Sequence, residues 1–258
     1  MITSIHQSML NMAFRCGEQF LRRYLEGEVI PPGIAMARGT GVHKANEINL
    51  LQKIISSTDM RLSDMEDVTR DAYIHSFDNG IYLPKEMVFF KNRLINEGLT
   101  DAISLTQLYH SEVAPEIEPI ETERKFKVWL PGIPLPLAGQ IDIQQHGRLD
   151  DLKTSGKKWP DGQIEREIQP IMYSLATEQE TGERPDFYYH ILRLLKAGPQ
   201  RQIQKIRATE AHYRALIAKI KTFIKMLDAG VFPPANPSSW WCDSVYCGFW
   251  DTCPYVKG

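Results

Sequence analysis

A carboxylate and an ammonium side chain stand one residue apart at Asp151 and Lys153. Side chains alternate between the two faces of a β-strand, so in a strand these groups point the same way and Asp150 points the other way. Asp142 supplies a second carboxylate if the preceding apolar run pairs with this one. Two carboxylates suit a hard cation such as Mg²⁺, and a neighbouring lysine can orient or deprotonate a water. The set predicts metal-assisted hydrolysis of a phosphodiester.

The surrounding residues have the pattern of a β-hairpin. Two apolar runs, 135–143 and 149–152, flank Gln-Gln-His-Gly, in which the glycine can adopt a positive φ. A run at 121–130 and a turn at 131–134 precede them, so we expect three consecutive strands. Glu123 could reach the site from the first strand, although we favour a solvent-facing position. Because an Asp-x-Lys triplet is common by chance, the rest of the chain has to support it.

Helices are expected in the first half of the chain. Apolar side chains recur at helical spacing over 3–25, and further helices are expected at 64–79 and 85–110. Between them, the turn at 39–41 opens a helix to about residue 56, with Thr40 as its N-cap. His43 and Glu47 share one face of this helix. A histidine beside apolar residues is more often structural, so His43 becomes a ligand candidate only if it faces the hairpin.

The second half predicts alternating helix and strand. A helix is expected over 163–181, where Gln169 and Tyr173 share a face and Pro170 marks the start or a kink. Without other motifs this pair would be ordinary structural residues. Residues 186–195 predict a strand, and 202–229 predict one long amphipathic helix. A strand that follows a helix fits a crossover onto the same sheet, so we expect an α/β fold with a central mixed sheet flanked by helices.

The four cysteines occupy the two ends of the chain: Cys16, then Cys242, Cys247 and Cys253 at C-x4-C-x5-C spacing. Such clustering in a cytosolic chain argues for metal or redox chemistry rather than disulfides. Structural zinc sites usually come as paired knuckles, whereas the wide spacing and Pro254 after the last cysteine favour an iron–sulfur cluster. Zinc is the first alternative and free buried thiols the second. Either metal would join the ends of the chain.

Composition sets further bounds. With 258 residues, 43% hydrophobic and 24% charged, the chain is an ordinary globular one of one large or two small domains. No apolar stretch approaches the roughly 20 residues of a membrane span, and no secretory signal is visible, so we expect a cytoplasmic protein. The net charge of −2 does not by itself indicate a nucleic-acid-binding protein, but basic clusters occur locally, including Lys157 and Lys158. The sequence contains no G-x-x-x-x-G-K-[ST] motif, so it predicts no ATP-driven motor.

Six motifs in order resemble the RecB-like branch of the PD-(D/E)XK nucleases: Cys16, Gly39-Thr-Gly-Val-His43, Gly139-Gln-Ile-Asp142, Asp151-Leu-Lys153-Thr, Gln169-x-x-x-Tyr173 and the C-terminal cysteines. The chain is most similar to the iron–sulfur members: the AddB nuclease domain, the four-cysteine nucleases of CRISPR adaptation and phage-borne relatives. The resemblance implies a single nuclease domain over 1–258. We expect a mainly helical part at 1–115, a catalytic sheet core at 116–200, and a long helix with the iron–sulfur segment at 201–258.

The resemblance also implies residue roles. Mg²⁺ or Mn²⁺ would be bound by His43, Asp142, Asp151 and the carbonyl of Leu152, and Lys153 would position or activate the attacking water. Gln169 and Tyr173 would hold the DNA backbone and support Lys153, with Lys157 and Lys158 as further DNA contacts. The four cysteines would hold a 4Fe–4S cluster as a structural staple. Asp150, where an apolar residue is usual, and the wide C-x4-C spacing depart from the family pattern.

The implied function is a metal-dependent DNA exonuclease acting on single strands or duplex ends, in recombination, repair or CRISPR-type DNA processing. Its partners would be DNA and recombination or CRISPR adaptation proteins. The alternative is a catalytically silent DNA-end-binding or recombination accessory protein that keeps the fold and the metal-binding cysteines, and a structural metal-binding scaffold comes third. The joint presence of His43, Asp142, Asp151 and Lys153 favours the enzyme.

Overall fold

The computed structural model describes residues 2–256, and the first half of the chain is helical. It contains α1 (Gln7–Arg15), α2 (Gly17–Phe20), the π-helical turn η1 (Leu21–Glu26), α3 (Ile34–Ser56), α4 (Leu62–His75), the 3₁₀ turn η2 (Lys85–Phe90), α5 (Lys91–Glu112) and the turn η3 (Ala114–Glu116). The helices predicted at 64–79 and 85–110 are confirmed with shifted ends. Within the described range, no helix combines the length and hydropathy that crossing a membrane requires.

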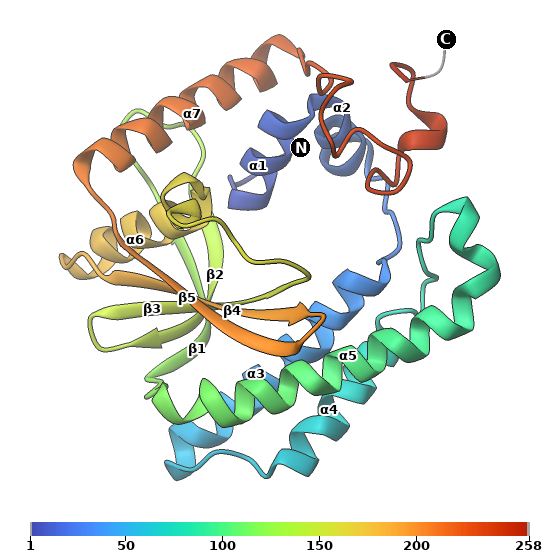
Figure 1. Cartoon of the computed structure of the whole chain (residues 1–258). Helices are drawn as coiled ribbons and strands as arrows, with labels where there is room; N and C mark the ends of the chain where they lie inside the picture. Colours follow the sequence, from blue (N-terminus) through green and yellow to red (C-terminus); the bar gives the residue numbers. More distant parts are fainter. Residues whose placement is uncertain (1, 257–258) are drawn as a thin grey trace.

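Five strands form one sheet in chain order: β1 (Glu121–Val128), β2 (Leu137–Gln145), β3 (Arg148–Ser155), β4 (Asp186–Leu195) and β5 (Gly198–Arg207). Only β3 and β4 run parallel. Their connection contains η4 (Gln163–Arg166) and α6 (Ile168–Thr181), because a parallel pair needs a long crossover. After β5 come α7 (Glu210–Ala229) and the turn η5 (Trp250–Thr252). The predicted mixed sheet flanked by helices is confirmed (Figure 1).

The sheet separates two hydrophobic cores (Figure 1). One face packs against α1, α6 and α7, and the other packs against α3, α4 and α5. Alternation along β4 assigns Phe187 and Tyr189 to the first core and Leu192 to the second. Neighbouring residues of a strand therefore point their side chains at different groups of helices.

A two-residue turn, His146–Gly147, joins β2 to β3, as the hairpin pattern predicts. Gly147 has a φ of 67°, a conformation that glycine adopts without steric cost. The register pairs Ile143 with Asp150. Asp150 consequently shares the face of Ile143, which belongs to the core of α3 to α5, and Asp151 lies on the face of α6.

The predicted helix over 202–229 is wrong at its beginning. Residues up to Arg207 belong to β5, where Gln204 and Ile206 are buried and Ile203 is 47% exposed, a period of two rather than 3.6. Thr209 then caps α7 by accepting a hydrogen bond from the backbone N–H of His212. The expected boundary between residues 200 and 201 therefore falls inside a strand.

Two helix boundaries in the first half also differ from prediction. α3 begins at Ile34 instead of at the turn over 39–41, and Thr40 lies inside the helix, where its hydroxyl donates to the carbonyl of Met36. The helical pattern over 3–25 is interrupted at Cys16, which has an extended backbone with φ of −162°. This break separates α1 from α2 and directs the first cysteine toward the end of the chain.

Candidate active site

Asp151 and Lys153 form an ion pair on the α6 face of β3. Lys153 Nζ lies 2.6 Å from Asp151 Oδ2, and the side chains are 30% and 2% exposed. Burial and the charge of Asp142 raise the pKa of Asp151 to about 6. Burial opposes the charge on Lys153, but Asp151 and Asp142 outweigh it and raise its pKa. The lysine therefore remains an ammonium group next to two carboxylates.

The carboxylate of Asp151 is oriented from α6. Gln169 Nε2 donates to Asp151 Oδ1 at 2.5 Å, and the hydroxyl of Tyr189 donates to Gln169 Oε1 at 3.2 Å. Asp151 Oδ2 is buried and faces the ammonium group of Lys153, its ion-pair partner. This oxygen therefore already contacts a positive charge.

Tyr173 follows Gln169 by one helical turn. Its ring packs edge-on against Phe126, with centroids 5.3 Å apart. The close approach of α6 to β2 requires Gly139, because a Cβ there would lie 2.7 Å from the Phe126 ring and 3.0 Å from that of Tyr173. Burial, Asp151 and Asp142 raise the pKa of Tyr173, so its hydroxyl stays protonated. Pro170 lies in the first turn of α6, where its missing N–H costs no helical bond.

His43 reaches the site from α3, on the other side of the hairpin. Its Nδ1 lies 3.4 Å from Asp142 Oδ2, and the side chains are 34% and 17% exposed. Burial disfavours the imidazolium, but the hydrogen bond to Asp142 and the charges of Asp142 and Asp151 raise the pKa of His43 overall. The histidine on the upstream helix therefore faces the hairpin, the condition that makes it a ligand candidate.

Glu123 is also part of this surface. The register pairs Thr122 with Ile143 and Arg124 with Ile141, which sets Glu123 across from Asp142. Its φ of 53° is unusual for a residue other than glycine, and Gln140 Nε2 donates to its carboxylate. Burial, followed by the charges of Asp142 and Glu47, raises the pKa of Glu123 to about 7. Glu123 is therefore half-buried beside Asp142 while it keeps some solvent exposure, and the strand register is the signal that identifies this residue.

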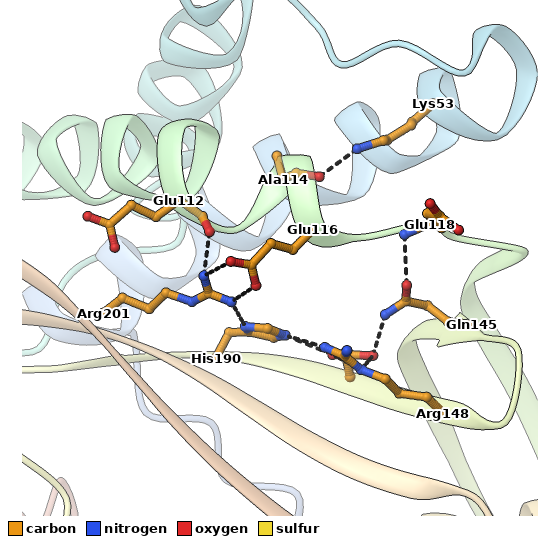
Figure 2. Close-up of polar contacts among 10 residues, drawn as sticks. Lys53, Glu112, Ala114, Glu116, Glu118, Gln145, Arg148, His190 and Arg201 are labelled. Carbon is orange, nitrogen blue, oxygen red and sulfur yellow. Dashed lines mark hydrogen bonds and ion pairs between the residues drawn. The ribbon is translucent and has the colours of Figure 1, made fainter.

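Asp150 lies on the opposite face in a separate polar network. His190 Nε2 lies 2.7 Å from Asp150 Oδ1, and Arg201 Nη2 donates to His190 Nδ1 at 3.1 Å. Arg148 also binds Asp150, and Arg201 continues the network to Glu116 of η3, with 2.5 Å between Nη2 and Oε2 (Figure 2). Asp150 is fully buried and compensated by Arg148 and His190, and the network that it belongs to reaches η3 through Arg201.

The remaining predicted contacts lie along β3 and its following loop. The Leu152 side chain is buried in the core of α3 to α5, so only its main chain is left for a ligand role. Lys157 and Lys158 are exposed in the loop between β3 and η4. Lys158 Nζ lies 3.7 Å from Asp161 Oδ1, an exposed pair that contributes little to stability.

The donor set of the site fits a hard divalent cation in type. His43 and Asp142 approach as a pair, Asp151 Oδ2 faces a positive charge, and Asp142 raises the pKa of Asp151 as a nearby negative charge does. Across residues 2–256, however, no three His, Cys, Asp or Glu side chains lie in an arrangement that would already hold a metal ion.

The four cysteines line one cavity. Figure 1 shows the C-terminal segment beside α2, near the start of the chain. All four are free thiols, with Cys16 and Cys247 buried. Burial raises the pKa of Cys242, and the other three sulfurs raise it further because they lie nearby. Backbone and side-chain N–H groups already point at sulfur: Ala235 N donates to Cys16 Sγ at 3.3 Å, and Gln19 Nε2 to Cys247 Sγ at 3.1 Å.

Comparison with known proteins identifies one family and several solved structures, two of which are given below. The sequence profile of the PD-(D/E)XK nuclease superfamily matches residues 5–254. A crystal structure of a candidate exonuclease from Eubacterium rectale has a TM-score of 0.61 and 13% identity, and covers 93% of this chain and 87% of that chain, a likeness of fold. The structure of SSO0001 covers 98% of this chain and 97% of that chain at 13% identity, with a TM-score of 0.39. No curated protein matches the chain.

Proposed function

Since the chain belongs to the PD-(D/E)XK nuclease superfamily, we propose that it hydrolyses phosphodiester bonds of DNA with Mg²⁺ or Mn²⁺ as cofactor. Superfamily membership makes it a nuclease; the DNA substrate and the metal are the proposed parts. The observation that carries the proposal is the ion pair of Lys153 with Asp151, whose pKa responds to the nearby charge of Asp142. A carboxylate pair that can hold a divalent cation beside an ammonium group is suited to metal-assisted attack on phosphorus.

His43, Asp142, Asp151 and the main-chain carbonyl of Leu152 are the proposed ligands. The metal would supply positive charge at the phosphate and a more acidic water. Lys153 orients that water and offsets the charge that develops on the phosphate oxygens. Its raised pKa favours a role as an ammonium group over a role as a base.

The α6 residues act through orientation and binding. Gln169 holds Asp151 by the hydrogen bond to Oδ1, which leaves Oδ2 for the metal. The protonated hydroxyl of Tyr173 is suited to donate to a phosphate oxygen of the DNA backbone. Lys157 and Lys158, exposed in the loop after β3, are suited to attract the same strand.

We propose an exonuclease that acts on single strands or duplex ends, in recombination, repair or CRISPR-type DNA processing, with the proteins of those processes as partners. The Eubacterium rectale protein of similar fold is described as a candidate exonuclease, in line with this assignment. We also propose that residues 1–258 act as one nuclease domain. Helices from both halves of the chain pack on a single sheet, which supports that organisation.

For the cysteines we propose a 4Fe–4S cluster that fastens the two ends of the chain, as in the iron–sulfur branch that includes the AddB nuclease domain. Four thiols around one cavity and two N–H groups that donate to sulfur support the proposal. Zinc is the alternative, because four thiolates suit either metal.

Nuclease assays with end-labelled single-stranded and duplex DNA test the function. We expect cleavage with Mg²⁺ or Mn²⁺, none in EDTA, and about 10²-fold or greater loss in Lys153→Ala. Lys221→Ala, which alters an exposed lysine of α7 outside the proposed DNA contacts, is the matched control and should lose far less. Binding of DNA ends without cleavage by any metal would instead support the silent accessory protein.

A further inference from the structure

Two exposed aromatic rings lie in the C-terminal segment that carries Cys242, Cys247 and Cys253, here called the cysteine segment. Neither ring belongs to one of the two hydrophobic cores. Trp240 is 64% exposed and Tyr246 is 62% exposed. Their ring centroids lie 5.1 Å apart at an angle of 89°. Large aromatic side chains contribute most when buried, so an exposed pair in contact suggests a ligand.

The pair lies close to the candidate active site. Lys157 Nζ is 5.5 Å from the ring centroid of Trp240. Lys157 follows Lys153 by four residues, which span at most about 14 Å of chain. A strand cleaved at Lys153 would therefore pass the aromatic pair within a few nucleotides.

The backbone that carries the rings is fixed by contacts with the first half of the chain. The hydroxyl of Tyr82 donates to the carbonyl of Ser244 at 2.8 Å, and Lys85 Nζ lies 3.0 Å from Asp251 Oδ1. Asp243 Oδ1 accepts from the backbone N–H of Val245 at 2.8 Å. The backbone next to Tyr246 is thus fixed before any ligand arrives, which lowers the entropy cost of binding.

We propose that Trp240 and Tyr246 form a stacking platform for unpaired bases of the DNA strand that enters the active site, with Lys157 contacting a phosphate of that strand. The inference rests on the proposed function and specifies its substrate class as single-stranded DNA or frayed ends. Every unpaired base offers a π face to an aromatic ring, whereas the bases of an intact duplex stack on one another. The cation beside the rings complements the phosphates.

Fluorescence anisotropy in EDTA, where no cleavage is expected, measures binding of a labelled single strand and of the matching duplex. Trp240→Ala should weaken single-strand binding at least about fivefold and leave duplex binding within about twofold. Trp240→Phe should restore most of the affinity. Trp129→Ala, which removes a tryptophan that is 63% exposed at the end of β1, is the matched control and should change neither.

The salt dependence separates stacking from charge. Lys157→Gln should reduce the slope of log affinity against log salt for the single strand by about 0.7, and Trp240→Ala should leave the slope unchanged. With unaltered protein, strands that carry one abasic nucleotide should lose affinity at particular positions, and Trp240→Ala should abolish this position dependence. The abasic series keeps the test valid if a variant disturbs the cysteine segment.

Equal weakening of single-strand and duplex binding by Trp240→Ala, or no position dependence with abasic strands, would overturn the platform. Unchanged single-strand binding in Trp240→Ala would also overturn the platform, and the rings would then be assigned to contact with a protein partner. If the unaltered chain cleaves DNA while these results hold, the proposed function survives without the platform. If it neither binds nor cleaves DNA, the proposed function itself falls.

Discussion

Asp150 and Asp151 are consecutive residues of β3 whose carboxylates lie on opposite faces of the sheet. Asp151 Oδ2 is 2.6 Å from Lys153 Nζ, and Asp150 Oδ1 is 2.7 Å from His190 Nε2. Both side chains are almost fully buried, so burial alone does not distinguish them. Their partners do, because one carboxylate faces the candidate site and the other binds Arg148 and His190 within the sheet.

The two Asp→Asn substitutions should separate chemistry from stability. Asp151→Asn removes a charge that would bind the metal, so we expect about 10²-fold or greater loss of kcat. Asp150→Asn leaves Arg148 and His190 with a weaker partner and should cost roughly 3 kcal/mol of unfolding free energy, with cleavage retained by the folded fraction. Urea denaturation and single-turnover cleavage measure the two effects. The reverse pattern would show that Asp150 serves the site.

Gly139→Ala should disturb both stability and cleavage. A Cβ at this position meets the rings of Phe126 and Tyr173, so β2 and α6 must move apart, at a cost of about 1–3 kcal/mol. Because α6 carries Gln169, the shift should also lower kcat. Gly156→Ala is the matched control, since its Cβ has no neighbour within 4 Å. Equal effects of the two substitutions on Tm and kcat would refute the packing argument.

Glu123→Gln should stabilise the metal-free protein at high pH. The pKa of Glu123 is raised from 4.5 to about 7, so the folded state holds the proton more tightly and the free energy of unfolding falls as pH rises through this range. In EDTA at pH 8 we expect a gain of roughly 1 kcal/mol, discounted for partial exposure, and almost none at pH 4. Glu121→Gln on the same strand is the control. A gain that does not depend on pH would contradict the repulsion from Asp142.

The sequence predicts those parts of the fold that depend on local patterns. Alternation and Gly147 define the hairpin, and with it the common face of Asp151 and Lys153. Residues 202–207 were misassigned because Ile203 and Ile206 also fit helical spacing, and only pairing with β4 decides in favour of a strand. The position of Glu123 likewise follows from the register of β1 against β2, a non-local property. The network of Asp150 with His190 and Arg201 joins residues of three strands, so no local sequence pattern predicts it.

Loss of the proposed metal from the cysteine site should loosen the ends of the chain before it affects the sheet. Cys16 and Cys247 line the same cavity from opposite ends of the sequence, and Arg22 adds a hydrogen bond to Thr252 Oγ1 at 2.6 Å. Cys247→Ser should remove the bound iron and the absorption near ~400 nm that a thiolate-ligated cluster is expected to show. It should also lower the Tm by several degrees. Ser244→Ala in the same turn is the control and should change none of these. A colourless protein with stoichiometric zinc would replace the cluster with a zinc site, and an unchanged Tm in Cys247→Ser would remove the structural role of either metal.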